Sequence, residues 1–528
     1  MPKKEVQEFL KEQNEEIKAV YVKAQLAYFT AMISGKQEDY KAYELAALEM
    51  EKFFHTKENF EKIKEFQKNR HEIKSDIEKR ELEILRLSYL GSQGDWQLIQ
   101  ELTKKSAEIE KKFNTYRAKI NNKEYTDNDI REILRTETDS EKLKEAWEAG
   151  KQIGKVAEKE VLEIIKLRNK LAKQLGFGNY YELKIEIGEQ NKEELIKLFK
   201  ELENSTNAPF KKLKQEIDDV LSKRYKIKPE EMRPWHYHDR FFQEGPEIYK
   251  VKLDDFYKKD VIEKAKNYYQ SIGIDISDIL ERSDLHEKKG KYQHACCMDM
   301  NRENDVRIIQ NVKNNERWMS TTLHELGHAV YNKYTDKSLP FLLRSEAHIF
   351  TTEAIALLFG RKSRNAEFIK HYGDEKPAEE LFEDIKKMLK LQELVFIRWA
   401  LVMFYFEQEL YKAPEQNLNK LWWSLVKKYQ LIDFSRDEPD WASKIHLVSA
   451  PVYYHNYVLG KLLASQLHYH IIKNFKLNKE TDYSGKKQVG EFLIKNIFMT
   501  SAKYKWDEMI KKALGEELTA KYFVEEFC

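Results

Sequence analysis

Apolar residues recur at helical spacing through the amino-terminal half of the chain. The stretch 96–120 is a clear example, because its apolar positions fall on one face of a helix: Leu98, Ile99, Leu102, Ile109 and Phe113. Similar amphipathic patterns fill residues 141–175 and 191–205. Such a face packs on a protein body while the opposite, charged face meets solvent. The pattern predicts a succession of helices over residues 1–225.

A different pattern occurs in the middle of the chain. Residues 291–300 and 305–312 are short, rich in β-forming residues and separated by the polar turn Asn301–Asp305, which predicts a β-hairpin. An exposed strand edge can pair with an extended peptide, so this hairpin is a candidate binding element. After it come three more apolar segments that we expect to be helices of the core, at residues 318–334, 348–360 and 394–410.

The composition indicates one folded body. Aromatic residues make up 12% of the 528 residues, more than disordered chains carry. With 18 Gly and 10 Pro, no Gly/Pro-rich linker marks a domain boundary. We therefore expect a mainly α protein: a single domain over residues 1–528, a large all-helical two-lobed body with a deep central cleft and a small β-hairpin. Within it, residues 1–125 would form a helical lid region, and residues 285–360 the hairpin and the helices that follow.

Charge and segment hydropathy argue against several classes of function. Lys and Arg number 92 against 90 Asp and Glu, a net charge of +2, which gives no electrostatic basis for binding nucleic acid. Residues 1–18 are charged throughout, and no segment reaches the roughly 18 uncharged apolar residues of a membrane span. Three cysteines, Cys296, Cys297 and Cys528, cannot form a disulfide framework. We expect a cytoplasmic protein without nucleic-acid or membrane partners, compatible with a monomer.

The segment Ser320–Val330 reads STTLHELGHAV and carries candidate metal chemistry. On a helix, His324 and His328 are four residues apart, so both imidazoles project from one face and can hold one ion. Glu325 is rotated from His324 by about 100° and can reach a water on that ion without being a ligand. The small Gly327 allows close packing, as in a buried metal-binding helix. Two core histidines that pack without a metal are the alternative, because this motif also arises by chance.

Catalytic zinc needs a third protein ligand and an open fourth position. A metzincin would have Gly three and His six residues after His328, where this chain has Tyr331 and Tyr334, so that class is excluded. Two downstream carboxylates compete instead. Glu346 lies close to an arginine and could form an ion pair. Glu353 lies in an otherwise apolar helix, where a carboxylate is costly unless it is paired or bound to metal, so we predict Glu353 as the ligand. Its pairing with a lysine or arginine is the alternative.

Two other histidine pairs are alternative candidates for metal ligands. His236 and His238 lie in WHYHD, and His468 and His470 lie in LHYH. Residues two apart share a face of a strand. The sequence around LHYH has a helical pattern, which would splay its two rings apart, so this interpretation is the weaker one.

With these residues identified, the chain resembles the peptidyl-dipeptidase A (angiotensin-converting enzyme) family, and more distantly the thimet oligopeptidase and oligoendopeptidase F family. The likeness extends from about residue 130 onward and is most specific in HELGHAVYNKYTDKSLPFLLRSEAHIFTTEAIA. The resemblance implies one Zn²⁺ per chain, held by His324, His328 and Glu353, with Glu325 as the catalytic general base.

The predicted hairpin also resembles a functional segment of the family. HACCMDMNRENDVRIIQNV is similar to its substrate-binding strand. The resemblance implies that His294 contacts the substrate and that the backbone of Ala295 and Cys297 pairs with it.

A downstream segment, WASKIHLVSAPVYYHNYVLG, resembles the part of the family that binds the substrate's carboxyl terminus. The roles that carry over are carboxylate binding by Lys444 and Tyr453 and transition-state stabilisation by His446. The residue types suit these roles, because Lys is a compact charge and His and Tyr can donate to an oxyanion. A helix start with a surface Lys and core Tyr residues is the alternative.

The segment departs from the family pattern at several positions. In an ungapped alignment Asn456 stands at the oxyanion tyrosine, so Tyr457 takes that catalytic role only after a one-residue shift. Tyr454 is the alternative for this role and is also a candidate for substrate binding. The oligoendopeptidase pattern matches Tyr453 and Tyr457 directly. His455 replaces the arginine behind chloride dependence, so we expect no chloride activation.

These observations predict a zinc-dependent peptidase that releases dipeptides from the free carboxyl terminus of oligopeptides. An oligoendopeptidase that cuts short peptides internally is the alternative. A second alternative is a non-catalytic peptide-binding scaffold with a structural metal, but such a scaffold has no need of Glu325. The amino-terminal helices would roof the cleft and admit flexible oligopeptides.

Overall fold

The computed structural model describes residues 3–528, so the first two residues of the predicted lid region lie outside it. The described chain is mainly α-helical with two small two-stranded sheets, which confirms the predicted fold class. The chain divides into two compact units. Within residues 3–528, no helix has both the length and the apolar character needed to cross a membrane. The assignment of a single catalytic domain with a lid stays a prediction.

The first unit contains the predicted hairpin and the apolar helices after it. It consists of Met1–Gln93, Val251–Lys386 and Leu459–Tyr522. The helices wholly within it are α1 (Lys3–Ser34), α2 (Gln37–Phe54), α3 (Lys57–Lys68), α4 (Asp76–Gly91), α11 (Val261–Ser271), α12 (Ser277–Arg282), α13 (Glu316–Lys333), α14 (Ile349–Gly360), α15 (Ala366–Tyr372), α20 (Lys487–Asn496) and α21 (Trp506–Leu514).

The second unit is formed mainly by helices from the middle of the chain. It consists of Gly94–Lys250, Lys387–Val458 and Phe523–Cys528. Its own elements are α5 (Trp96–Thr115), β1 (Ala118–Ile120), β2 (Lys123–Tyr125), α6 (Asp127–Thr136), α7 (Ser140–Lys151), α8 (Ile153–Gln174), α9 (Tyr180–Ile187), α10 (Lys192–Tyr225), α17 (Leu418–Gln430) and α18 (His446–Ser449). Three helices cross a unit boundary: α16 (Phe382–Lys412), α19 (Tyr454–Phe475) and α22 (Lys521–Phe527).

The predicted hairpin is present in the first unit. Strands β3 (Cys296–Asp299) and β4 (Val306–Ile309) are antiparallel, with Cys297 opposite Ile308 and Asp299 opposite Val306. The turn between them closes through a hydrogen bond from the Met300 N–H to the Asp305 carbonyl, with a donor–acceptor distance of 2.8 Å. The hairpin predicted from the β-forming runs and the polar turn is therefore confirmed.

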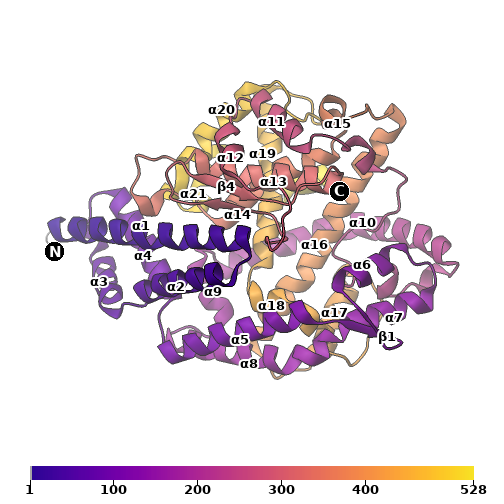
Figure 1. Cartoon of the computed structure of the whole chain (residues 1–528), viewed down its shortest axis with the longest axis horizontal. Coiled ribbons are helices and arrows are strands. Elements are labelled where there is room, and N and C mark those ends of the chain that lie inside the picture. The colour runs from indigo at the N-terminus through magenta and orange to yellow at the C-terminus, as the bar shows by residue number, and fades with distance from the viewer. Residues whose placement is uncertain (1–2) are drawn as a thin grey trace. The chain divides into compact units, whose positions relative to one another are not determined.

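Helices α13 and α14 pack on each other in the core of this unit, and α13 also packs on β3 and β4 (Figure 1). The side chain of Asn315 caps α13 by accepting from the Trp318 N–H. Its apolar face is fully buried, and the helix α14 that it packs against is buried along most of its length. The buried residues of α13 include Leu323, Leu326, Ala329 and Val330. This confirms the two apolar segments as core helices.

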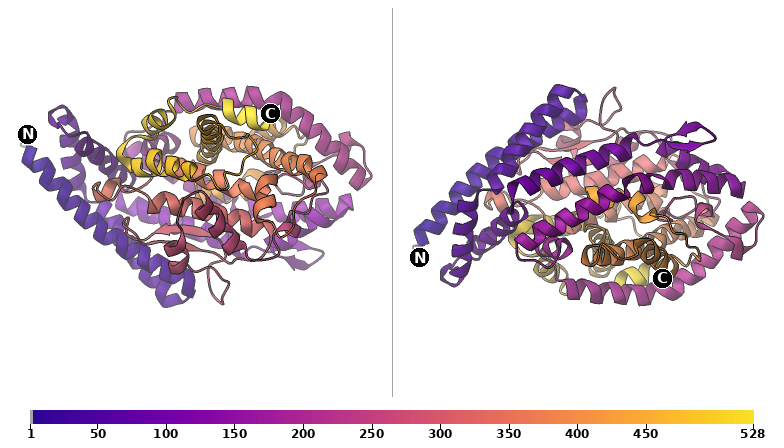
Figure 2. Two further views of the ribbon diagram at one scale, coloured as in Figure 1. Left: turned by 90° about the horizontal axis from the view of Figure 1, so that it is seen from above. Right: turned by 90° about the horizontal axis from the view of Figure 1, so that it is seen from below.

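The amino-terminal helices α1 and α2 run alongside each other in both views of Figure 2. One face of α1 packs on the hairpin. Phe29 and Met32 share a buried apolar cluster with Met298 and Met300, and the Met32 carbonyl accepts a hydrogen bond of 2.8 Å from the Tyr292 N–H. The first helix of the chain thus covers the strand that the sequence singled out.

Two local predictions were wrong. The stretch 96–120 was expected to be one helix, but α5 ends at Thr115 and a second hairpin, β1–β2, follows. Its turn residues Asn121 and Asn122 both have positive φ, which matches a two-residue hairpin turn. The stretch 141–175, also read as continuous, is divided at Gln152 into α7 and α8.

Candidate metal centre

Two histidines of α13 face each other across one helical turn. The Nε2 atoms of His324 and His328 are 3.2 Å apart, and their ring planes meet at 83°. Two nitrogens bound to one tetrahedral zinc at the usual bond length lie roughly 3.3 Å apart. The spacing therefore fits a pair of ligands to a single ion.

Glu353 of α14 completes the group. Its Oε2 atom is 3.9 Å from His324 Nε2, and the ligand atoms of His324, His328 and Glu353 all lie within 4.8 Å of one another. Within residues 3–528 no other group of three or more His, Cys, Asp or Glu side chains meets this condition, and Glu346 does not belong to this group. The structure thus brings together the three residues that the sequence analysis proposed as ligands, and nitrogen and oxygen donors of this kind fit zinc.

The surroundings of both histidines favour the neutral imidazole, which is the form that binds metal. The Nδ1 of His328 is 2.7 Å from the hydroxyl oxygen of Thr352, and a hydroxyl that accepts Nδ1–H leaves the Nε2 lone pair for a metal. Burial, together with the nearby charge of Lys461, lowers the pKa of His324 to about 4. Burial also holds the pKa of His328 well below its usual value. Both rings are therefore neutral at neutral pH, the state that binds metal.

Glu325 lies on the same helix, next to the ligand group. Its side chain is buried, and its carboxylate accepts a hydrogen bond from the backbone N–H of Cys297. Burial raises the pKa of Glu325 to about 8, and the negative charge of Glu353 contributes to the rise. A carboxylate with a pKa in this range can both take up and return a proton near neutral pH.

Glycines allow the ligand-bearing helices to approach closely. A Cβ added at Gly327 would lie 2.7 Å from the Cα of Ala356, so α13 and α14 touch backbone to backbone at this point. A Cβ at Gly460, on α19, would lie 3.2 Å from the Cβ of Glu353. The Gly327 contact holds the two histidines and Glu353 at a fixed separation.

The predicted substrate-binding strand begins beside Glu325. His294 is exposed and its ring centroid lies 5.2 Å from that of Tyr292. Ala295 and Cys297 are half-buried. Because Glu325 contacts the Cys297 N–H, the backbone of β3 directly adjoins the candidate base.

The segment Lys444–Tyr457, for which we predict binding of the substrate's carboxyl terminus, lies in the second unit, and its predicted side chains cluster there. Lys444 is buried, its Nζ donates to Gln243 Oε1 at 2.6 Å, and burial lowers its pKa to about 8. The ring of His446 packs on Tyr454 with centroids 5.3 Å apart. The ring of Tyr457 lies 4.9 Å from Tyr453 and 5.6 Å from Tyr454. All five predicted residues therefore belong to one local group.

Sequence reasoning missed the residues that hold this segment in place. Arg168 of α8 donates to the carbonyls of Leu447 and Val448 at 2.7 and 2.6 Å. The backbone N–H of Val452, whose φ is +56°, donates to Glu407 at 2.9 Å. A β-branched residue with positive φ is strained and persists only where its surroundings fix it. Neither Arg168 nor Glu407 has a local sequence signal, because both act across long separations in the chain.

The other histidine pairs have partners of their own. His236 lies in a short 3₁₀ helix, where its Nε2 is 2.9 Å from the Ser140 hydroxyl, and His238 accepts from the Glu247 N–H. His468 is hydrogen-bonded to the Tyr483 hydroxyl and to the Lys479 carbonyl. Neither pair belongs to the metal group of residues 3–528.

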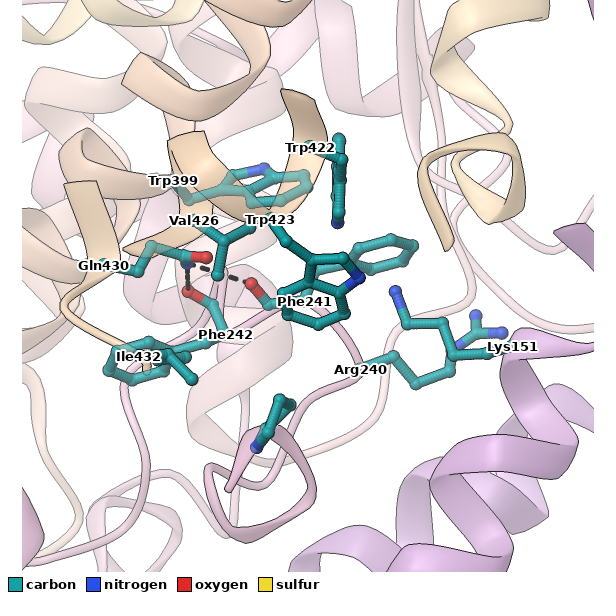
Figure 3. A pocket seen from close by; sticks show the side chains of 11 residues that line it. Lys151, Arg240, Phe241, Phe242, Trp399, Trp422, Trp423, Val426, Gln430 and Ile432 are labelled. Carbon is teal, nitrogen blue, oxygen red and sulfur yellow. Dashed lines mark hydrogen bonds between the residues drawn. The ribbon is translucent and has the colours of Figure 1, made fainter. Parts of the chain in front are cut away.

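A small cavity of the second unit is lined by aromatic and cationic side chains (Figure 3). The lining residues are Lys151, Pro234, Arg240, Phe241, Phe242, Trp399, Trp422, Trp423, Val426, Gln430 and Ile432. The amino group of Lys151 lies 3.5 Å from the centre of the Phe241 ring. The cavity volume is about 20 Å³, which is room for about one water molecule. This cavity is therefore too small to bind a peptide.

Comparison with known proteins agrees with the resemblance. A sequence model of peptidase family M3 matches residues 133–528, which include the ligand group, β3 and the segment around Lys444. A model described as angiotensin-converting enzyme matches residues 2–230.

Two curated proteins show weaker similarity. Thermostable carboxypeptidase 1 of Pyrococcus furiosus is 23% identical over 257 residues, covering 42% of this chain and 49% of that protein. Angiotensin-converting enzyme of Mesocricetus auratus is 26% identical over 277 residues, covering 48% of this chain and 20% of that protein. The chain thus spans half or less of the length of each of these relatives.

Proposed function

The chain belongs to peptidase family M3, and on that premise we propose that it is a zinc-dependent peptidase that hydrolyses oligopeptides, releasing dipeptides from the free carboxyl terminus. The observation that carries this proposal is the joint placement of His324, His328 and Glu353 around one point, with Glu325 beside them. A buried carboxylate next to a complete ligand set is needed for hydrolysis and serves no purpose in a structural metal site.

His324, His328 and Glu353 would hold the ion and leave one position open. When bound, zinc supplies Lewis acidity and lowers the pKa of a coordinated water towards about 7. Glu325 takes the proton of the attacking water and returns it to the leaving nitrogen, a role that its position directly after His324 on α13 allows.

The developing negative charge on the peptide carbonyl needs hydrogen-bond donors. We assign this task to His446 and Tyr457, on the resemblance of their segment to the family. Loss of one such donor typically costs roughly 3 kcal/mol of transition-state stabilisation. Burial, with the nearby charge of Lys444, lowers the pKa of His446 to about 3, so it would act as a neutral N–H donor.

We assign substrate contacts to residues of both units. The β3 backbone at Ala295 and Cys297, with His294, would pair with the extended peptide. Lys444 and Tyr453 would bind the terminal carboxylate, and Tyr454 would line the same subsite. The names of the relatives are compatible with this choice, since one is a carboxypeptidase.

A second candidate function is an oligoendopeptidase that cuts short peptides internally. It is favoured by the M3 match, which covers the ligand group and the segment around Lys444. It is also favoured by Tyr453 and Tyr457, which match the oligoendopeptidase pattern.

Mass spectrometry of one peptide separates the two candidates. An amino-blocked nonapeptide is incubated with the purified protein, as the free acid and as the carboxyl-terminal amide. Release of terminal dipeptides from the acid alone is expected. Internal cleavage of both forms would replace the dipeptidase by the oligoendopeptidase, and binding without chelator-sensitive cleavage would leave a peptide-binding scaffold.

The role of Glu325 has its own test. Glu325→Gln is expected to keep one zinc per chain, measured by elemental analysis, while turnover falls by roughly 10²- to 10⁴-fold or more. Glu346→Gln is the matched control, since it removes a carboxylate that does not belong to the ligand group. Near-normal turnover of Glu325→Gln would show that the general-base assignment is wrong.

A further inference from the structure

The free edge of β3 has a defined set of backbone groups. Met300 donates to Asp305 across the hairpin, and with the register of β3 and β4 this places Cys296 and Met298 in the hydrogen-bonded pairs. In an antiparallel ladder the intervening residues direct their N–H and C=O groups away from the partner strand. Cys297 and Asp299 therefore face the free edge, which is the edge where Glu325 meets the Cys297 N–H.

Helix α1 already occupies the last group of this edge. The Tyr21 hydroxyl donates to the Asp299 carbonyl at 2.8 Å, and the Gln25 amide donates to the same carbonyl at 3.1 Å. A carbonyl oxygen has two lone pairs, so both acceptor positions are filled. An incoming peptide N–H would find no acceptor at Asp299.

These two donors are held firmly. The Tyr21 ring contacts Arg302, whose guanidinium carbon is 4.7 Å from the ring centre, and Phe341, at 5.7 Å between centroids. Gln25 also donates to the Tyr21 hydroxyl at 3.1 Å. Removing Tyr21 from Asp299 would therefore break several contacts at once.

The rest of the α1 face anchors the helix to both sides of the hairpin. Lys18 pairs with Glu303 at 2.6 Å, in the hairpin turn. At the far end of α1, a Cβ added at Gly35 would lie 2.0 Å from the Gly290 carbonyl oxygen, so the two backbones are in contact. Lys18, Tyr21 and Gln25 are spaced by three and four residues, which places them on one face of the helix.

We infer that α1 ends the peptide-binding edge of β3 at Asp299, so that Tyr21 and Gln25 are specificity-determining residues that limit how far a bound peptide pairs toward its amino terminus. The inference rests on the proposed function, because it takes β3 as the edge that receives the peptide. Antiparallel pairing is the more stable arrangement, and it directs the amino-terminal part of the peptide toward Asp299.

The consequence is a definite pattern along the peptide. The peptide residue opposite Cys297 can donate its own N–H to the Cys297 carbonyl, whereas the Cys297 N–H is already bonded to Glu325. The residue two positions closer to the amino terminus can accept from the Asp299 N–H, but its own N–H finds the Asp299 carbonyl occupied. Residues beyond it gain no pairing. The favoured substrates are therefore short on the amino-terminal side.

An amide-to-ester scan tests this pattern. Fluorescent nonapeptides, each with one backbone amide replaced by an ester, are titrated against the Glu325→Gln protein by anisotropy, so that binding is read without cleavage. Esters at the residues opposite Ala295 and Cys297 are expected to weaken binding by roughly 2- to 10-fold each. The ester two residues closer to the amino terminus is expected to have no effect.

Opening the edge should add one sensitive position. In Tyr21→Ala/Gln25→Ala, combined with Glu325→Gln, that next ester should also weaken binding by roughly 2- to 10-fold. Gln25→Ala alone leaves the Tyr21 ring in place. In this variant the same ester should weaken binding, but by less than in the double variant. Thr30→Ala is the matched control, because its exposed hydroxyl bonds only the Leu26 carbonyl of its own helix; it should leave the pattern unchanged.

The outcomes distinguish the inference about α1 from the proposed catalytic function. An identical set of sensitive esters in the parent and in both opened variants, all folded by circular dichroism, would overturn the inference, as would a scan in which no ester matters. If the alternating pattern and its extension appear but the wild-type protein cleaves none of the peptides, the inference stands and the proposed catalysis is wrong.

Discussion

At the residue scale, the orientation of His328 depends on a single hydroxyl. Thr352 contacts the Nδ1 of His328 at 2.7 Å, and such partners of metal-bound histidines fix the ring and its tautomer. Thr352→Val removes the hydroxyl and keeps the shape. We expect zinc affinity, measured by competition with a chelator of known affinity, to fall roughly 10- to 100-fold.

The neighbouring threonine provides the control for this prediction. Thr351→Val also removes a buried hydroxyl, but that hydroxyl donates to the His348 carbonyl and not to a ligand. Its zinc affinity should stay close to that of the wild type. Equal losses in the two variants would mean that Thr352 acts through general packing.

The charge on Lys444 gives a pH dependence with a definite sign. Burial lowers its pKa to about 8. The amino group is therefore charged below pH 8 and loses its charge as the pH rises through that value. If Lys444 binds the terminal carboxylate, the KM of free-acid peptides should rise about tenfold per pH unit above 8. Peptide amides serve as the control: their inhibition constant against cleavage of the free acid should show no such rise. Parallel profiles for acid and amide would remove Lys444 from the carboxylate site.

The sequence predicted the candidate metal ligands and Glu325, but not the residues that hold the neighbouring segments in place. His324, Glu325 and His328 are neighbours in one motif, and Glu353 is detectable because it is a carboxylate in an apolar helix. Gln243, Arg168 and Glu407 could not be found in this way, since each contacts its target from a distant part of the chain. The partners of Asp299 on α1 were missed for the same reason.

At the element scale, the separation of α13 and α14 depends on Gly327. A Cβ there would come within 2.7 Å of the Ala356 Cα and 3.0 Å of its N, and backbone atoms cannot rotate away. Gly327→Ala should reduce stability by about 1–3 kcal/mol through overpacking, measured by denaturant unfolding. Because α14 carries Glu353, zinc affinity should fall as well.

Two further variants bracket the Gly327 result. Thr321→Ala changes a half-buried residue of α13 whose hydroxyl forms a solvent-exposed bond to the Arg317 carbonyl of its own helix, and should alter neither quantity. Gly460→Ala meets the Glu353 Cβ at the longer distance of 3.2 Å, so its effect should be smaller than that of Gly327→Ala. A stable, fully metal-binding Gly327→Ala protein would contradict the tight helix contact.

Predictions of elements succeeded where the pattern was strong. The core helices α13 and α14 have long apolar faces, and β3–β4 has β-forming runs on either side of a polar turn. The β1–β2 hairpin was missed because its strands are short and polar, although Asn121 and Asn122 carried a turn signal. The division between α7 and α8 has no Pro or Gly at Gln152 itself, so periodicity alone could not locate it.

At the scale of the whole molecule, the metal should contribute to folding stability. All three proposed ligands come from the first unit, so metal would bind only after α13 and α14 have formed. Free zinc at 100 times its dissociation constant stabilises a folded protein by about 2.7 kcal/mol. We expect a chelator to lower the unfolding midpoint measured by calorimetry and added zinc to restore it. Glu353→Gln should show a much weaker response to zinc.

The central claim is that the group on α13 and α14 makes this chain a zinc peptidase. The most direct test is cleavage of an amino-blocked nonapeptide by protein stripped of metal with a chelator and then reconstituted with one equivalent of zinc, with products identified by mass spectrometry. We predict no cleavage by the stripped protein, restored cleavage after zinc addition, and none by zinc-loaded Glu325→Gln. Cleavage that persists without metal, or a zinc-loaded wild-type protein that leaves every peptide intact, would contradict the claim.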